Sequence, residues 1–529
     1  MAVYILATLL FLVFAISGWR VLFPKPFAGI PYNKESARNV MGDLLNLLSA
    51  IKDTGGFANA ILTISTRNLR VPIAQVLFPV FRSPLIVIDD PREVEDILWR
   101  RQKDFGPSKT SLDVLSSVFP RGWFTQYTTP QFKSSKRLYA NALRIEFLHK
   151  TVAPIVYEST YDLIHLWRLK ETTALEARCF MVGDDIENLT LDIIWAAIVG
   201  DKPGITKTRL KDLQDQHAYE RKILDNRKLF LTEEMTYVRD AIIRHSSSPF
   251  PKWVQDLDRY SPRYRKFRAT MSGEISRLMK QHFHRSQSFG ALQVDGDYPD
   301  TCVMEILFRC QARENERATD PICSSEQFDN IFMLLIAGHD STAVTLMWFV
   351  KFMAAYQVAQ RELRAALSAA FPCGPKTADD ILKVEVPYLD ATCEETFRLS
   401  GTSKANLRQA LVDTEVLGCK VPKGAEVLLN FHIEQTPFPI NETQRSRTCQ
   451  EAAVRSGDGC KDEAGQDLGV FDPSRWLTGD GKPGGASFNP MALPRLGFGG
   501  SFRECLGKQL LSELNGSKMH HWSLTTFGQ

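Results

Sequence analysis

Hydrophobic residues recur at the spacing of amphipathic helices along most of this chain. Apolar positions three and four residues apart predict helices over 92–102, 133–170, 184–200, 207–245 and 262–283. A further apolar stretch, from Ile331 to Val350, predicts a long buried helix whose start carries the capping pair Ser324 and Gln327. The chain is therefore expected to be mainly helical.

Strand patterns are fewer and shorter. The branched apolar run Leu85–Ile88 predicts a strand that ends before Asp89-Asp90-Pro91. A second strand pattern covers 406–430, where the segment 421–427 reads as a turn followed by a strand. The segment 437–470 is polar and is expected to be a surface insertion. The predicted fold class is mainly α with small β-sheets.

The N-terminus has the pattern of a membrane anchor. No charge occurs from Val3 to Trp19. The apolar segment at residues 1–23 is close in length to the roughly 20 residues that a spanning helix needs. Because Arg20 and Lys25 follow the run, the positive-inside rule places the remaining chain in the cytosol. A cleaved signal peptide is the alternative, although Trp19-Arg20 makes a poor cleavage site. Prolines then predict a stiff hinge and linker over 24–50, before a large domain at 51–529.

Composition excludes several classes of protein. A net charge of +3 does not favour nucleic-acid binding. The ten cysteines are scattered and include no C-x-x-C pair, so neither a disulfide framework nor a zinc ribbon is indicated. Scattered cysteines are typical of a reducing compartment.

The apolar stretch carries the first candidate chemistry, in Ala337-Gly-His-Asp-Ser-Thr342. Gly338 weakens the helix and would let a ligand approach, and the hydroxyls of Ser341 or Thr342 can bond back to a carbonyl. A carboxylate and a hydroxyl at such a place, Asp340 and Ser341, could relay protons. The alternative is a core helix whose polar groups are all satisfied.

Two further patterns follow. Glu395 and Arg398 are three residues apart, so they share one helix face and can pair. In the loop sequence Phe471-Asp-Pro-Ser-Arg-Trp476, Arg475 could bond to Glu395 or to nearby carbonyls. Each pattern is weak when taken alone.

The last pattern is the run Phe498-Gly-Gly-Ser-Phe-Arg-Glu-Cys-Leu-Gly507. Its glycines permit a close approach to something flat and bulky, and its arginine offers donors to a carboxylate. A lone thiolate there, on Cys505, suits an axial ligand to haem iron.

Together and in this order, the patterns resemble the cytochrome P-450 family, of microsomal type and fungal style. The resemblance implies the fold of that family, haem b, and Cys505 as the thiolate ligand of the iron. Asp340, Ser341 and Thr342 would form the catalytic segment that delivers protons during dioxygen activation. Haem contacts are implied for Phe498, Arg503, Gly507, Lys136 and Arg408. Glu395, Arg398 and Arg475 would hold the core beneath the haem.

The chain departs from the family pattern at several positions. Ser501 stands where glycine is usual, which predicts a strained backbone. Phe132 replaces tryptophan and Lys136 replaces arginine. After about residue 514 the sequence no longer resembles the family, and a pocket-lining hairpin is expected to be missing.

The resemblance implies a monooxygenase that inserts one atom of dioxygen into a small apolar substrate, as in fungal secondary metabolism. Electrons would come from NADPH through a flavoprotein reductase, with cytochrome b5 as a further donor. The enzyme would be a single-pass protein of the endoplasmic reticulum membrane, in contact with lipid and not with nucleic acid. A haem-thiolate isomerase or dehydratase, and an inactive membrane-bound remnant, are the alternatives.

Overall fold

The structure is a computed structural model that describes residues 22–116, 118–173, 180–214, 226–246, 248, 251–290, 301–314, 325–375, 377–433, 438–456, 467–479 and 486–508. It divides into two compact units. The sheet unit comprises Met1–Ser111, Ser403–Val470 and Pro494–Glu504, and the helical unit comprises Leu112–Thr402, Phe471–Leu493 and Cys505–Gln529. Residues 1–21 of the anchor expected at 1–23, and the divergent segment after about 514, lie outside the described residues. The boundaries of anchor, hinge and haem domain stay predictions.

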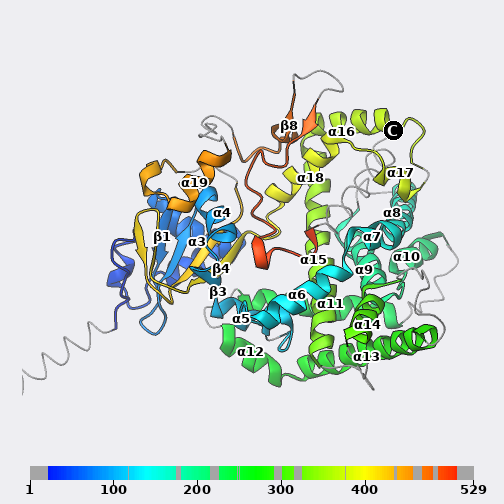
Figure 1. Cartoon of the computed structure of the whole chain (residues 1–529), viewed down its shortest axis with the longest axis horizontal. Coiled ribbons are helices and arrows are strands. Elements are labelled where there is room, and N and C mark those ends of the chain that lie inside the picture. The colour runs from blue at the N-terminus through cyan, green and yellow to red at the C-terminus, as the bar shows by residue number, and fades with distance from the viewer. Residues whose placement is uncertain are drawn as a thin grey trace, which may run out of the picture. The chain divides into compact units, whose positions relative to one another are not determined.

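The sheet unit is built on a five-stranded sheet of order β1-β2-β7-β4-β3 (Figure 1). All its pairs are antiparallel except β2 with β7, which run parallel. β2 is the apolar run predicted from sequence, and it is buried on both faces. The region 406–430 holds four strands where one strand pattern was expected. The strands of the unit are β1 (Ile73–Val76), β2 (Leu85–Ile88), β3 (Phe105–Pro107), β4 (Ala405–Ala410), β5 (Thr414–Val416), β6 (Cys419–Val421) and β7 (Glu426–Asn430).

Short helices complete the sheet unit. They are η1 (Ser36–Arg38), α2 (Leu44–Thr54), α3 (Phe57–Leu62), the π turn η2 (Thr63–Arg67), α4 (Pro91–Trp99), η6 (Glu442–Gln444), α19 (Arg447–Ser456) and η8 (Ser501–Arg503). α5 (Lys109–Ser116) includes the boundary between the two units. Asp90 caps α4 by accepting a hydrogen bond from the Glu93 amide, and Pro91 occupies the first turn, where its missing N–H costs nothing.

The polar segment after residue 437 is more closely packed than a surface insertion would be. Arg445 is buried and its guanidinium donates two hydrogen bonds to Asp90, at 2.6 and 3.1 Å. Ser446 and Thr448 donate their hydroxyls to the buried carboxylate of Asp96. Buried carboxylates need such donors, so this part of the segment is held against α4.

The helical unit contains the long helices of the described residues together with several short helical turns. They are η3 (Trp123–Thr125), α6 (Pro130–Ala142), α7 (Ile145–Phe147), η4 (Leu148–Val152), α8 (Ala153–Thr173), α9 (Gly183–Val199), α10 (Ile205–Gln214), α11 (Asn226–Ser246), α12 (Pro251–Tyr260), α13 (Pro262–Gly290), α14 (Val303–Glu314), α15 (Ser325–Ala355), α16 (Gln357–Ala370), α17 (Ala378–Leu382), α18 (Pro387–Ser400) and η7 (Pro473–Trp476). A two-stranded ribbon of β8 (Leu477–Thr478) and β9 (Ser487–Phe488) follows η7. The mainly helical class with small sheets is confirmed.

The expected helix over 133–170 is divided into several pieces. Pro154 lies within this run and has no amide hydrogen to donate to the preceding turn. The π turn η4 precedes it, but α7, η4 and α8 follow one another without a break. The run is interrupted earlier, between α6 and α7, where Arg144 is extended with ψ of 153°. The other helical predictions match single helices, and 207–245 includes α10 and α11, with residues 215–225 between them outside the described residues.

The core of the helical unit lies around α15, which packs against α9, α18, α16, α13 and α11 (Figure 1). Large fully buried side chains fill it, including Trp195, Phe332 and Phe349. Within the part of the chain that the structure describes, α15 alone is long and apolar enough to cross a membrane, and 56% of its most apolar window is buried inside the protein. That burial is typical of a core helix. Ser324, the expected cap residue, lies outside the described residues.

Candidate functional site

Glu395 on α18 is the most completely bonded carboxylate of the candidate residues. Its side chain is fully buried. Oε1 accepts from Arg398 Nη2 at 2.7 Å and from Arg475 Nε at 3.0 Å. It also accepts from the backbone amide of Asp472 at 2.9 Å. Oε2 accepts from Arg398 Nε at 2.8 Å and from the indole of Trp476 at 2.9 Å. The sequence pairs predicted separately therefore form one network.

Both alternatives that the sequence offered for Arg475 occur together. Its Nε donates to Glu395 and also to the Asp472 carbonyl, at 3.1 Å. Phe471 stacks on Phe352 of α15, with ring centroids 4.7 Å apart. The loop that looked irregular in the sequence is thus fixed to two helices of the helical unit.

The middle of α15 is packed closely against α9. A Cβ on Gly338 would come within 3.0 Å of the Ile194 side chain. The missing side chain of Gly338 therefore makes room for the neighbouring helix, and the approach of a ligand there stays a prediction. His339 is buried, and its Nε2 lies 3.1 Å from the Glu187 carbonyl on α9. Burial lowers the pKa of His339 to about 4, so the ring is neutral at physiological pH.

Asp340 is more exposed to solvent than the preceding residue, His339. Its side chain is 39% exposed, and Oδ1 lies 3.9 Å from Arg239 Nη1. Arg239 is also paired with Glu187, at 2.6 Å. Burial raises the pKa of Asp340, and Arg239 opposes that shift. The carboxyl is thus poised to take up and release a proton more readily than an ordinary surface aspartate.

Ser341 and Thr342 complete the segment. The Ser341 hydroxyl donates to the Ala337 carbonyl at 2.6 Å, which is the back-bond that the sequence predicted. α15 remains helical through this point. The Thr342 side chain is buried. The sequence does not indicate a role for Arg239, because its pairing with Asp340 joins helices about a hundred residues apart in the chain.

The C-terminal loop presents the candidate thiol. Cys505 is exposed and forms no disulfide. A Cβ on Gly507 would lie 3.7 Å from the Cys505 sulfur, at ordinary contact distance. Both residues belong to the helical unit.

The preceding part of the loop belongs to the sheet unit, and its backbone is strained where the sequence predicted. Ser501 has φ of 52°, in the left-handed region that favours glycine, and Gly499 has φ of 68°. A Cβ on Gly500 would come within 3.0 Å of the Trp99 ring, so this glycine permits close packing on α4. Phe498 precedes these residues.

Arg408 and Arg503 form a pair of neighbouring cations within the sheet unit. Burial lowers the pKa of Arg408 to about 10, and burial together with the charge of Arg408 lowers the pKa of Arg503 to about 10. Arg408 Nη1 donates to the side-chain amide oxygen Oδ1 of Asn406 at 2.6 Å, a neutral partner that leaves the charge of Arg408 unneutralised by that contact. Two adjacent guanidiniums fit a ligand with acidic groups, such as the propionates of haem.

Lys136 lies on α6, one turn after Phe132. Phe132 is buried against Trp123, with ring centroids 5.5 Å apart, while Lys136 is partly exposed. Phe132 and Lys136 both lie on the helix where the pattern was expected. The role of Lys136 toward haem stays a prediction.

Comparisons with known proteins agree with these patterns. The family model described as Cytochrome P-450 matches residues 76–433. The monooxygenase TRI13 of Fusarium sporotrichioides is 26% identical over 524 residues, covering 92% of this chain and 88% of that protein. The monooxygenase xilC of Penicillium rubens is 28% identical over 526 residues, covering 93% and 85%. Both relatives are named as cytochrome P-450 monooxygenases.

A solved structure shows the same fold. The crystal structure of a cytochrome P-450 named CYP102L1 superposes with a TM-score of 0.63 at 17% identity, covering 95% of this chain and 92% of that one. The fold and the family imply haem whose iron has an axial cysteine thiolate. The chain therefore belongs to the cytochrome P-450 family and is an enzyme of the monooxygenase class.

Proposed function

We propose that this enzyme oxidises a small apolar organic compound, with Cys505 as the axial ligand of its haem and electrons from NADPH through a flavoprotein reductase. When bound, haem with a thiolate ligand supplies the activation of dioxygen, of which one atom enters the substrate and the other becomes water. The observation that carries the proposal is the exposed thiol of Cys505, at the end of a loop of unusual backbone shape.

The cations Arg408 and Arg503 would hold the acidic groups of the haem. Each has a pKa lowered by burial, so a carboxylate partner would restore the stability that their burial and mutual repulsion remove. Lys136 would add a third donor. Phe498 would shield the sulfur, and Gly507 would leave room beside it.

Asp340 and Ser341 would move protons to the reacting oxygen. The raised pKa of Asp340 brings its carboxyl closer to the pH at which a proton donor works well. Its partial exposure lets it exchange protons with solvent. Ser341 and Thr342 place hydroxyls on the next two residues of α15.

Glu395, Arg398 and Arg475 would act by positioning. Their network joins α18 to the loop at 471–476, and no member has an exposed polar group to offer a substrate, since each side chain is at most 7% exposed. We assign them to holding the helical unit in shape.

The cellular setting is also proposed. The uncharged run from Val3 to Trp19 supports a single-pass anchor in the endoplasmic reticulum membrane, with the enzyme in the cytosol. The relatives come from fungi, which supports a role in secondary metabolism. Cytochrome b5 would be a further electron donor.

The ligand assignment is tested with Cys505→Ala and with the matched control Cys373→Ala, because Cys373 is also exposed. Each protein is reduced, treated with carbon monoxide and examined by absorbance. Wild type and control should give the thiolate-type Soret band, and Cys505→Ala should lose it while remaining membrane-associated. A normal band in Cys505→Ala would refute the assignment. A normal wild-type band without oxygen consumption driven by NADPH and reductase would favour the isomerase alternative.

A further inference from the structure

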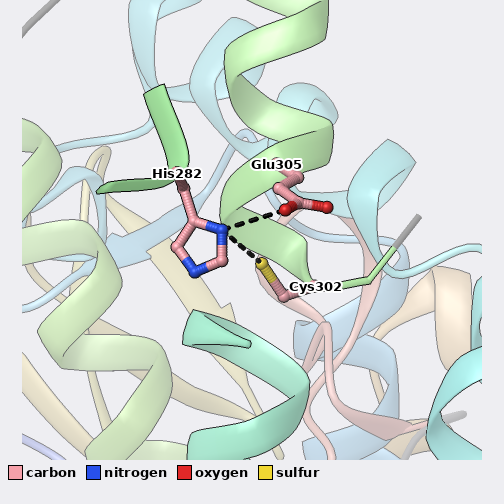
Figure 2. Close-up of side chains that lie close together, drawn as sticks. All are labelled: His282, Cys302 and Glu305. Carbon is pink, nitrogen blue, oxygen red and sulfur yellow. Dashed lines mark hydrogen bonds and ion pairs between the residues drawn. The ribbon is translucent and has the colours of Figure 1, made fainter. Parts of the chain in front are cut away.

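Three side chains with metal-binding atoms meet in the helical unit, away from the residues discussed above. They are His282 on α13, Cys302 immediately before α14, and Glu305 in the first turn of α14 (Figure 2). One ligand atom from each lies within 4.8 Å of the other two. Cys302 and Glu305 are three residues apart at a helix start, so they face the same side.

The cluster is largely shielded from solvent. Cys302 is fully buried, the His282 side chain is 7% exposed, and the Glu305 side chain is 14% exposed. Imidazole, thiolate and carboxylate together are a donor set that suits Zn²⁺, which binds all three types. The partial exposure of Glu305 provides a path by which an ion could enter.

Hydrogen bonding alone accounts poorly for the arrangement. Glu305 Oε1 lies 2.9 Å from His282 Nδ1, and Cys302 Sγ lies 4.0 Å from the same nitrogen. Both dashed contacts in Figure 2 end on that one ring nitrogen. A ring nitrogen has a single in-plane direction for bonding, so it can serve one partner well. A catalytic triad would instead use both ring nitrogens. Three donors that converge on one place are the arrangement that a metal ion requires.

The distances are close to those of a zinc site. Ligand bonds of about 2.0 to 2.3 Å in a tetrahedron place neighbouring ligand atoms roughly 3.3 to 3.6 Å apart. Shifts of about half an ångström would bring the two contacts on His282 Nδ1 to that geometry, and the Cys302–Glu305 separation, which is at most 4.8 Å, would have to shorten by about an ångström. Glu305 Oε2 already accepts from the Thr301 amide at 3.2 Å and from the Thr301 hydroxyl, so Oε1 is the oxygen left for the ion.

Charge also favours an ion. Zn²⁺ with one thiolate, one carboxylate and one neutral imidazole has no net charge, which suits a buried place. Without an ion, Glu305 is paired with His282 and lies 3.8 Å from Arg285. The ion-free cluster is thus a hydrogen-bonded pair that a metal could replace.

The end of α9 closes a third side of the cluster. Gly200 has φ of 75°, and a Cβ there would come within 2.8 Å of the His282 ring and 3.0 Å of the Cys302 sulfur. The helix therefore ends against the cluster at a residue that leaves room for it.

We propose that His282, Cys302 and Glu305 bind one Zn²⁺ ion, with water as the fourth ligand. The ion would fasten α13 to the start of α14 beside the end of α9, and its role would be structural. The proposal does not depend on the haem assignments.

The test is equilibrium dialysis of the purified full-length haem protein against Zn²⁺, followed by elemental analysis of zinc, iron and sulfur. We expect one tightly held zinc per chain. Absorption fine structure at the zinc edge should show one sulfur at about 2.3 Å and nitrogen or oxygen neighbours at about 2.0 to 2.1 Å. Cys302→Ser and His282→Gln should each weaken zinc binding by about 100-fold or more.

Matched controls are available on the same helices. Cys310→Ser on α14 and His284→Gln on α13 should retain wild-type zinc affinity. The carbon monoxide spectrum reports whether each variant is folded. Zinc should also raise the thermal unfolding midpoint of wild type and both controls, because it binds the folded state. Absence of tightly held zinc in wild type, or a zinc spectrum without sulfur, would overturn the proposal, and neither outcome depends on a variant that folds.

Discussion

Two carboxylates on neighbouring helices of the helical unit differ in almost every respect. Glu395 on α18 is fully buried and accepts five hydrogen bonds from two arginines, one indole and one backbone amide. Asp340 on α15 is 39% exposed and lies 3.9 Å from an arginine that is bound more closely to Glu187. A saturated carboxylate holds its surroundings in place but has no capacity left for chemistry. An unsaturated one contributes little to stability and can exchange a proton.

The contrast between the two carboxylates is tested first with Glu395→Gln, which should have the largest effect on stability. The amide cannot neutralise Arg398 and Arg475, and breaking a buried pair costs about 3–5 kcal/mol. Urea unfolding should therefore show a much lower midpoint, with early loss of the Soret band. The exposed Glu385 supplies the control Glu385→Gln, which should unfold like wild type. Equal midpoints for Glu395→Gln and wild type would mean that the network does not stabilise the fold.

The second prediction concerns His339, which precedes Asp340 but faces α9. Its pKa falls from an ordinary 6.5 to about 4 in the folded protein because it is buried. The unfolded chain therefore binds a proton that the folded chain excludes, and stability is lost as pH falls from about 6.5 to about 4. The full loss is on the order of 3 kcal/mol.

This effect is measured as the urea midpoint at pH 7 and at pH 4.5. His339→Gln should lose less stability on acidification than wild type, while the control His284→Gln, at an exposed position, should behave as wild type. An unchanged acid response in His339→Gln would show that this histidine is not the group responsible.

Asp340→Asn sharpens the comparison from the functional side. Replacing the carboxyl should lower product formed per NADPH by about 100-fold, the low end for general acid catalysis, with more peroxide released. The carbon monoxide spectrum should stay normal. Asp240→Asn, on α11 near Arg239, is the matched control and should retain coupling.

The same variant carries a stability prediction of opposite sign to that for Glu395. The pKa of Asp340 is raised on folding, so its charged form opposes folding and stability rises as pH falls through that pKa. Asp340→Asn should therefore be at least as stable as wild type at pH 7. A marked destabilisation would make Asp340 structural, like Glu395, and would remove the contrast.

Ser501→Gly should have the smallest effect, a gain of about 1 kcal/mol. Its φ of 52° is costly for any residue with a Cβ, and glycine relieves that cost. Ser501→Ala keeps the Cβ and is the control, with no gain expected in thermal unfolding. A gain in both variants would point to the hydroxyl rather than to the backbone. The result tests whether the loop before Cys505, like Asp340, lowers the free energy of unfolding.

Much of the fold was accessible from sequence because periodicity records which side of an element is buried. α9, α13, α15 and β2 were all located in this way. The division of the 133–170 run was missed because the break is short, at Leu143 and the extended Arg144, and the apolar spacing continues across it. The packed segment after residue 437 was missed because its polar residues looked solvated. Their partners, Asp90 and Asp96, are some 350 residues away in the chain.

The sequence by itself determined the family patterns in their order, the pairing of Glu395 with Arg398, and the strain at Ser501. Each depends on residues that are close in the chain or on a motif of fixed spacing. Only the tertiary structure decided that Gly338 admits α9, that Arg239 is shared by Glu187 and Asp340, and that His282 meets Cys302 and Glu305. The reason is physical: local spacing sets which face of a helix is buried, but the packing of helices decides which buried polar groups meet.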